Sequence, residues 1–397
     1  IIKIISSLIF VHINRALVIA ASFVITFFSF GIRYTYGMLL PEIMNELNLS
    51  NTEAGAIYTC FFISYLIFVV ITGFLADMRS VKKVTMIFLP LLGLGTSLMS
   101  IMNSYISGIL FFSIVGIGAS IGWVPLVIWS QKTYPHKRRF VLGIIQIGCN
   151  LGWGTIGLIL PLLLEWIGWR GIWLLLGLLS LILPFPLAFF AYDPSRIYLD
   201  NRGLGEHIKD IFVLMKSYRF LLGGLAYLLT SFAIMIHLTF FKAYMVFELG
   251  LDYSLATMLY GIIGIIAILG SLFISLYSDK LGIFWSLIVC NLILALGLTL
   301  MTIYTSYLIL PIIFVGISYG MIWPLYASLV KDLFKWEVIG SIMGIWSLMC
   351  SIGLSLSSLI GGIIVDIYGS YKFPYILGAI ISLLSIMVIV ILKRRAE

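Results

Sequence analysis

The chain has 397 residues, of which 62% are hydrophobic and only 10% are charged, and its mean hydropathy is +1.15. A soluble domain carries about 45–50% apolar and about 25% charged residues, so this composition excludes a soluble globular fold and favours a membrane protein. The net charge of +8 would suggest nucleic-acid binding in a soluble protein, but in a membrane protein the position of each charge matters more than the sum.

Apolar runs long enough to cross a membrane as helices follow one another along the whole chain. Twelve of them are predicted, at 16–41, 54–76, 84–103, 105–130, 140–163, 171–192, 219–247, 255–278, 283–303, 306–330, 338–364 and 372–392. One long polar stretch, 193–218, divides them into two sets of six. The sequence therefore predicts an all-α membrane protein with twelve transmembrane helices in two six-helix bundles, 1–192 and 219–397, joined by a cytoplasmic linker.

Basic residues concentrate in alternate loops. If the amino terminus lies in the cytoplasm, nearly all of the 24 Lys and Arg residues fall in cytoplasmic loops and termini. Only Arg170 and Lys372 then fall in outer loops, while Arg33 and Lys242 fall within spans. The positive-inside rule therefore predicts a multi-pass protein with both termini in the cytoplasm. Its expected location is the plasma membrane.

The two halves of the chain repeat each other at a near-constant offset of about 200 positions. Asp77 corresponds in this way to Asp279, and Trp123 corresponds to Trp323. The offset indicates two pseudo-symmetric six-helix units that arose by duplication. Transporters built from such repeats bind their solute near the midplane, between the repeats.

The segment 73–83 reads Gly-Phe-Leu-Ala-Asp-Met-Arg-Ser-Val-Lys-Lys, and 279–282 reads Asp-Lys-Leu-Gly at the equivalent place in the second half. These segments resemble the signature loop of the major facilitator superfamily, although Met78 and Ser80 depart from it. The basic run and the glycines of 134–152 resemble the monocarboxylate and oxalate/formate branches. The resemblance implies a secondary transporter of a small organic anion that works by alternating access. Helices 8 and 11 lack the basic residues that those branches carry, which leaves the exact substrate open.

Asp77 stands at the predicted cytoplasmic end of the second helix, near Arg79 and Lys83, and recurs as Asp279 in the second half. A carboxylate in this place can pair with bases or cap the amino terminus of a neighbouring helix. Such a contact acts as a gate when it is made in one conformation and broken in the other. Asp77, Arg79, Lys83 and Asp279 are therefore the candidate gating residues, and a loop that only sets the orientation is the alternative.

Ionisable side chains inside the predicted spans indicate a candidate solute site. Every carboxylate is expected at a span end or in a loop, whereas Arg33, His237 and Lys242 fall inside spans. A buried base without an acidic partner favours an anion, and the substrate is the natural one. Arg33 precedes Pro41 by 8 residues, which puts it about 12 Å below the expected end of the first span. Snorkelling to the interface is the alternative for Arg33 and Lys242, and Lys242 could also pair with Glu248.

Polar and aromatic side chains at helical spacing extend this candidate site, with helix packing and hydrogen bonding between helices as the alternative role. The predicted substrate-binding residues are Arg33, Tyr36, Gln146, Asn150, His237, Lys242, Trp323 and Tyr326. His237 and Lys242 are turned by about 140° from each other around a straight helix, so they cannot both face one cavity.

Coupling to protons needs a group that titrates near the working pH, and His237 is the candidate because no carboxylate is expected inside a span. Exchange of one anion for another, or a substrate that carries its own proton, are the alternatives. No nucleophile or acid–base cluster predicts an enzyme, and no motif predicts a metal, a nucleotide or another cofactor.

The sequence therefore predicts a transporter that functions as a monomer without a cofactor or nucleic-acid partner. Its expected partners are a small anionic solute, the lipid bilayer and, if transport is coupled, protons. A drug exporter, a carrier of neutral solutes and a non-transporting membrane sensor on the same fold are the alternatives.

Overall fold

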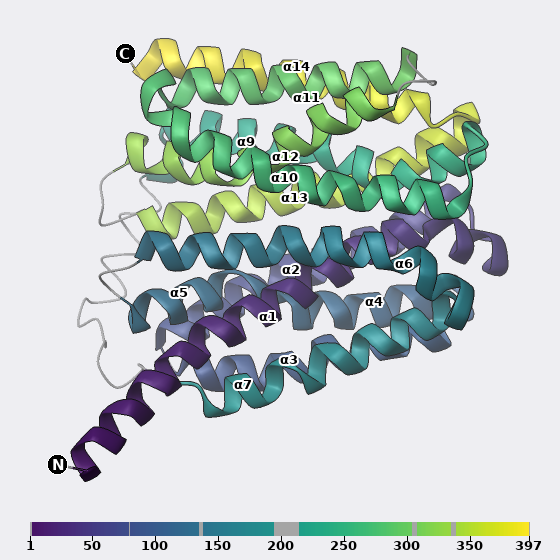
Figure 1. The fold of residues 1–397 in the computed structure, drawn as a ribbon. Helices are drawn as coiled ribbons and strands as arrows, with labels where there is room; N and C mark the ends of the chain where they lie inside the picture. Colours follow the sequence, from purple (N-terminus) through teal and green to yellow (C-terminus); the bar gives the residue numbers. More distant parts are fainter. Residues whose placement is uncertain are drawn as a thin grey trace. The chain divides into compact units, whose positions relative to one another are not determined.

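A computed structural model describes the backbone of residues 2–78, 80–134, 138–193, 214–303, 308–334 and 339–396. Side chains are described for these residues except 2–12, 77–78, 131, 138–140, 274–280, 339–341 and 396. Nearly all of the described backbone is helical (Figure 1), which confirms the predicted all-α fold. Most of the predicted linker 193–218 lies outside the described residues.

The described residues of the first half form seven α-helices and two short 3₁₀ turns. They are α1 (Ile2–Leu47), α2 (Asn51–Met78), α3 (Val81–Leu98), η1 (Met99–Ile101), α4 (Tyr105–Ala119), η2 (Ser120–Gly122), α5 (Val124–Thr133), α6 (Arg138–Ile182) and α7 (Pro184–Phe190). The second half contains α9 (Tyr218–Ala243), the π-helical turn η4 (Tyr244–Glu248), α10 (Tyr253–Leu281), α11 (Ile283–Ile303), α12 (Ile309–Leu333), α13 (Ile339–Tyr368) and α14 (Lys372–Ala396).

Among the described residues, 11 helical segments are long and apolar enough to cross a membrane. One of them, Val141–Phe190, has 50 residues. A straight helix of that length would measure about 75 Å, whereas the hydrocarbon core is about 30 Å thick. Gly168 interrupts this segment with φ 63° and ψ 174°, a conformation that glycine adopts readily, and the α6 ribbon turns back on itself (Figure 1). This segment therefore contains two crossings, which accounts for the twelve predicted spans.

The first helix differs from its prediction at its far end. α1 continues through Pro41 to Leu47, whereas the predicted span ends at residue 41. Proline is tolerated inside membrane helices because neighbouring groups and local adjustments satisfy the carbonyl that it frees. Arg33 therefore lies about 21 Å from the end of its helix instead of about 12 Å. The extension also places Glu42 inside a membrane-spanning helix.

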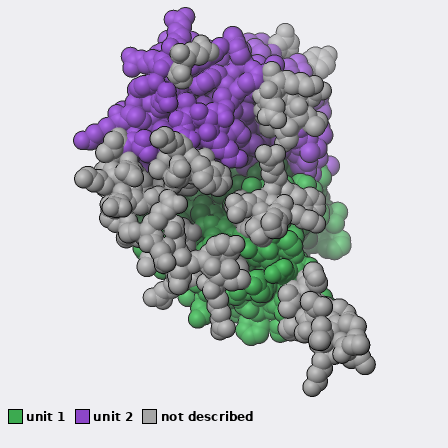
Figure 2. Space-filling view, turned by 90° about the vertical axis from the view of Figure 1, so that its left-hand side faces the viewer, with its two compact units in different colours: residues 1–36, 63–200 green, residues 37–62, 201–397 purple. Residues whose placement is uncertain are grey.

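Contacts between Cα atoms divide the chain into two compact units (Figure 2). Unit 1 comprises residues 1–36 and 63–200, and unit 2 comprises residues 37–62 and 201–397. The end of α1 and the start of α2 thus belong to the same unit as α9 to α14. The division into bundles 1–192 and 219–397 stays a prediction.

Small residues bring the helices of each unit close together. In unit 1, a Cβ atom at Gly118 of α4 would lie 2.1 Å from the backbone nitrogen of Leu92 in α3. In unit 2, a Cβ atom at Gly320 of α12 would lie 1.9 Å from the carbonyl oxygen of Ala267 in α10. Helices in membranes commonly associate through such close backbone approach.

Candidate functional site

Arg33 lies on α1 in unit 1, and only 5% of its surface is exposed. Its guanidinium carbon is 4.5 Å from the ring centroid of Phe30 and 4.7 Å from that of Tyr65 on α2. The negative face of an aromatic ring attracts a cation most strongly where water is excluded. The fold therefore holds a positive charge inside a membrane span, between two aromatic side chains.

The helix α6 packs against this part of α1 within unit 1. The ring of Tyr34 stacks on that of Trp153, with the centroids 4.4 Å apart. Arg33 of α1 interacts electrostatically with Cys149, which lies on α6 like Trp153. Asn150, the next residue of α6, is 2% exposed. Arg33 and Asn150 are thus the predicted site residues that the packing of α1 on α6 brings into one region.

Two other predicted residues of unit 1 have different surroundings. Tyr36 is fully buried, and its ring stacks on Phe112 of α4 with the centroids 4.7 Å apart. Gln146 lies one turn before Asn150 on α6 and is half-buried. The contact of Tyr36 corresponds to helix packing, while Gln146 extends the polar face of α6.

His237 lies on α9 in unit 2 and is fully buried. Its ring centroid is 5.1 Å from that of Phe241 and 5.2 Å from that of Tyr375 on α14. Within the part of the chain that the structure describes, neither ring nitrogen of His237 has a hydrogen-bond partner, and the Tyr375 hydroxyl has none. The imidazole therefore lies in an aromatic setting, with both ring nitrogens buried.

Tyr326 and Trp323 lie on α12 in unit 2. The Tyr326 hydroxyl is 2.8 Å from that of Thr230, which also lies 2.9 Å from the Ser385 hydroxyl. The Tyr326 ring stacks on Tyr227 at a centroid distance of 4.2 Å, and the half-buried Trp323 meets Tyr227 edge-on at 6.0 Å. These contacts favour the packing role that the sequence left open for both aromatic residues.

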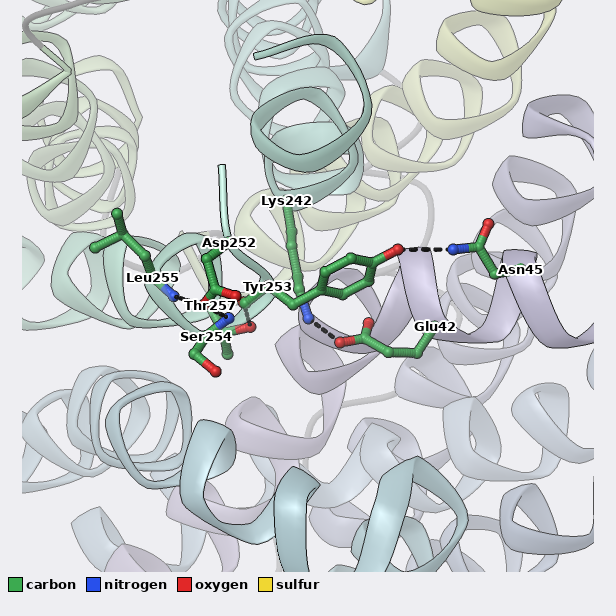
Figure 3. Close-up of polar contacts among 8 residues, drawn as sticks. All are labelled: Glu42, Asn45, Lys242, Asp252, Tyr253, Ser254, Leu255 and Thr257. Atoms are coloured by element: carbon green, nitrogen blue, oxygen red, sulfur yellow. Dashed lines mark hydrogen bonds and ion pairs between the residues drawn. The ribbon is translucent and has the colours of Figure 1, made fainter. Parts of the chain in front are cut away.

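Lys242 of α9 forms an ion pair with Glu42 of α1 (Figure 3). The Lys242 side chain is fully buried, and 12% of the Glu42 side chain is exposed. Lys242 therefore has an acidic partner inside the protein, and this partner is Glu42, near the end of α1, instead of Glu248, the alternative that the sequence left open. Glu42 was missed because it follows Pro41 directly, where the first span was expected to end.

The start of α10 lies beside this ion pair (Figure 3). The Lys242 Nζ atom is 5.4 Å from the ring centroid of Tyr253, whose hydroxyl accepts a hydrogen bond from Asn45 Nδ2 at 2.7 Å. Asp252 caps α10 by accepting two backbone N–H groups at 2.8 and 3.3 Å, and its charge also reaches Lys242. Oε2 of Glu42 is buried and has no hydrogen-bond partner among the described residues.

A second polar cluster joins α2, α13 and α14 in unit 2. Asp366 of α13 accepts hydrogen bonds from the backbone N–H groups of Asn51 and Thr52 at 3.1 and 2.7 Å. The Tyr371 hydroxyl donates to Asn51 Oδ1 at 2.6 Å, and the Tyr371 N–H donates to Glu248 at 2.6 Å. Burial, together with the charges of Asp366 and Glu248, raises the pKa of Tyr371 above its ordinary value. The phenol therefore stays protonated and serves as a donor.

The candidate gating residues are only partly described. The side chains of Asp77 and Asp279, and the whole of Arg79, lie outside the described residues. Lys83 is exposed, and its backbone N–H donates to the Ser80 hydroxyl at 3.1 Å, which caps α3. Their gating role stays a prediction.

The described groups have a limited chemistry. No cluster of three or more His, Cys, Asp or Glu residues that could hold a metal ion occurs among the described side chains. Among the described Lys, Arg, Asp, Glu and His side chains, Arg33, Lys242 and His237 are buried, and the Glu42 carboxylate beside Lys242 is 12% exposed. Such groups can bind an anion and exchange a proton.

Comparison with known sequences gives similarity over most of the chain. The family model described as Major Facilitator Superfamily matches residues 22–334 and, in a second match, 223–397. The "Hexuronate transporter" of Bacillus subtilis (strain 168) is 23% identical over 376 residues, which cover 87% of this chain and 86% of that protein. The "Probable sulfoacetate transporter SauU" of Cupriavidus necator is 23% identical over 190 residues, 45% of this chain and 42% of that protein.

Solved structures share the fold. The structure of the nucleoside transporter NupG superposes with a TM-score of 0.78 at 16% identity, over 95% of this chain and 99% of that chain. A bacterial homologue of the human lysosomal transporter spinster, in an inward-facing and unoccupied conformation, gives a TM-score of 0.73 at 15% identity, over 96% of both chains. At these identities the likeness shows the fold alone. Because the family model covers most of its length, the chain belongs to the Major Facilitator Superfamily of membrane transporters.

Proposed function

We propose that the protein carries a small organic anion across the membrane by alternating access. The observation that carries this proposal is the burial of Arg33 within a membrane span, 5% exposed and between the rings of Phe30 and Tyr65. Burying a cation in a membrane is costly, and such a residue usually serves a substrate or ion pathway. A guanidinium presents a planar fork of donors that matches a carboxylate or sulfonate.

The names of two relatives support an anionic substrate. Hexuronates and sulfoacetate, which those relatives are named for, both carry acidic groups that are ionised at neutral pH. They differ in size and in their other groups, so they support an anion class and no single compound. Coupling to protons and exchange of anions are both compatible with this class.

The orientation and the membrane are part of the same proposal. The protein lies in the plasma membrane in this proposal, and the bias of Lys and Arg toward alternate loops supports both termini in the cytoplasm. In this orientation, Glu42 and Lys242 lie toward the outer ends of their helices. We further propose that the monomer is the functional unit, since each chain carries both halves of the repeat.

The experiment that tests this function is counterflow in proteoliposomes that contain the purified protein. Labelled glucuronate, sulfoacetate, lactate and oxalate are offered in turn, with a labelled nucleoside as a neutral comparison. We expect exchange of at least one anion above the level of empty liposomes. Arg219→Gln, which removes an exposed cation near the linker, is the matched control and should keep that rate. Counterflow of the nucleoside alone would overturn the anion proposal.

A further inference from the structure

We infer that Glu42 and Lys242 form a displaceable ion pair that couples one proton to one substrate anion. In this inference, which rests on the proposed function, a proton binds Glu42 and the anionic group of the substrate takes its place beside Lys242. The pair is drawn in Figure 3.

The two oxygens of the Glu42 carboxylate have different surroundings, and Oε2 is the one that can bind a proton. Oε1 of Glu42 accepts the hydrogen bond from Lys242 Nζ. Oε2 of the same carboxylate is buried, and no hydrogen-bond partner for it occurs among the described residues. A proton can bind to such an oxygen without breaking an existing hydrogen bond, and the oxygen then becomes an O–H donor. Protonation of an oxygen that accepts two N–H groups would instead weaken those hydrogen bonds.

The position of the ion pair links protonation of Glu42 to the separation of α1 from α9. Glu42 lies on α1, the first helix of one repeat, and Lys242 lies on α9, the first helix of the other. Separation of these helices at this end would leave two uncompensated charges in a buried setting, which is strongly unfavourable. Protonation of Glu42 removes one charge, and an anionic substrate compensates the other.

The charge balance of this step is complete. Glu42 takes up one proton from water, Lys242 keeps its own proton throughout, and the substrate supplies the negative charge that Glu42 has lost. A monoanion and a proton then cross together, and their charges sum to zero. Release on the other side returns the proton to water and restores the ion pair.

The polar groups of α10 and of the residue before it that lie near the pair have hydrogen-bond partners of their own. Asp252, which directly precedes α10, interacts electrostatically with Lys242, and its carboxylate accepts two backbone N–H groups of the first turn of α10. The Tyr253 hydroxyl is occupied by Asn45. Tyr260, also from α10, donates to the carbonyl oxygen of Leu238 at 2.7 Å.

Two further ionisable residues of unit 2 contact groups other than Glu42 and Lys242. His237, on α9 itself, packs on Tyr375 of α14. Glu248, in the turn that follows α9, accepts hydrogen bonds from Ser370 and Tyr371. The pairing of Glu42 with Lys242 is therefore separate from both groups.

The test uses proteoliposomes and labelled glucuronate, with acidic medium outside and neutral medium inside. The wild type should accumulate label above the outside concentration. Glu42→Gln is permanently neutral, so it should keep counterflow and lose accumulation driven by the pH difference. Its affinity should be flat with pH, whereas wild-type affinity should improve by up to about tenfold per unit of acidification, the limit for one proton. Glu46→Gln removes an exposed carboxylate one turn further along α1 and should behave as wild type.

A measurement on the wild type alone guards against a variant that fails to fold. Addition of glucuronate to vesicles loaded with a pH-sensitive dye should acidify the interior, with one proton per anion. Transport of glucuronate without proton movement, or accumulation by Glu42→Gln equal to wild type, overturns the coupling role and leaves the proposed function intact. Failure of every offered anion to exchange in the wild type overturns the proposed function itself.

Discussion

The Asp366 carboxylate caps the first turn of α2 through Thr52, accepting hydrogen bonds from its N–H at 2.7 Å and from its hydroxyl at 2.5 Å. A negative charge at this position also interacts favourably with the positive end of the helix dipole. Below the cap, α2 and α13 stay in contact, since the Thr59 hydroxyl donates to the carbonyl oxygen of Ser355 at 2.8 Å. One acidic side chain near the end of α13 thus joins a helix of the first half to the second half.

Loss of this cap should loosen the contact between α2 and α13. Asp366→Ala should destabilise the folded protein by about 0.5–2 kcal/mol, the usual cost of a lost helix cap, and should raise the labelling rate of a cysteine placed at Thr59. Thermal unfolding in detergent and thiol labelling, in a background without Cys60, measure the two effects. Ser217→Ala removes the cap of α9 and should affect stability without the change in labelling. Equal labelling rates in both variants would contradict a joining role for Asp366.

Replacement of Arg33 should abolish transport of the anionic substrate. Arg33→Ala removes the buried charge, and Arg33→Lys should restore transport only in part because the bidentate fork is lost. Uptake by proteoliposomes, normalised to the amount of folded protein, measures this effect. Uptake by Arg33→Ala at the wild-type rate would show that the guanidinium does not contact the substrate.

The candidate gating carboxylates should act on the rate of the conformational change. Asp77→Asn and Asp279→Asn should each slow turnover more than they weaken substrate binding, since they bias the equilibrium between conformations. Turnover is measured by uptake, and affinity by binding to the detergent-solubilised protein. A collapse of affinity, without any change in labelling from either side of the membrane, would argue for a substrate contact instead.

The structure alters what we expect of His237. With Glu42 inside a span, the histidine is no longer the one candidate for proton coupling. We expect His237→Gln to keep the response to an imposed pH gradient while weakening substrate affinity or packing against Tyr375, because its ring nitrogens are buried without partners in the described region. Uptake with and without the gradient measures this. Loss of the gradient response in His237→Gln, with counterflow intact, would assign the proton path to the histidine.

Close packing of α1 on α6 predicts unequal effects for two glycines of α6. A Cβ atom at Gly152 would lie 2.0 Å from the carbonyl oxygen of Phe27, whereas a Cβ atom at Gly143 would meet nothing within 4 Å. Gly152→Ala should lower the melting temperature clearly. Gly143→Ala should leave it unchanged or raise it, since alanine is favoured over glycine in helices by about 1 kcal/mol. Similar melting temperatures for the two variants would show that α1 moves aside at little cost.

Much of the fold could be predicted from the sequence. Backbone groups in a bilayer must bond within their own segment, so a long apolar run predicts a helix almost without regard to its neighbours. The twelve spans, the interruption between the spans 140–163 and 171–192, and the resemblance to the superfamily all follow from local composition and short motifs. The angle of about 140° between His237 and Lys242 around their helix also follows from their spacing in the sequence. In agreement with it, His237 contacts α14 and Lys242 contacts α1.

The partners of the buried side chains were decided by tertiary structure alone. Helices often end near a proline, so the sequence predicts an end at Pro41. Only the tertiary structure shows that α1 continues past Pro41 and includes Glu42. Glu42 and Lys242 are 200 positions apart, and Asp366 and Thr52 are 314 apart. Periodicity places a side chain on a face of its own helix, but the residue that it meets depends on which helices pack together and at what height. That information arises only when the whole chain has folded.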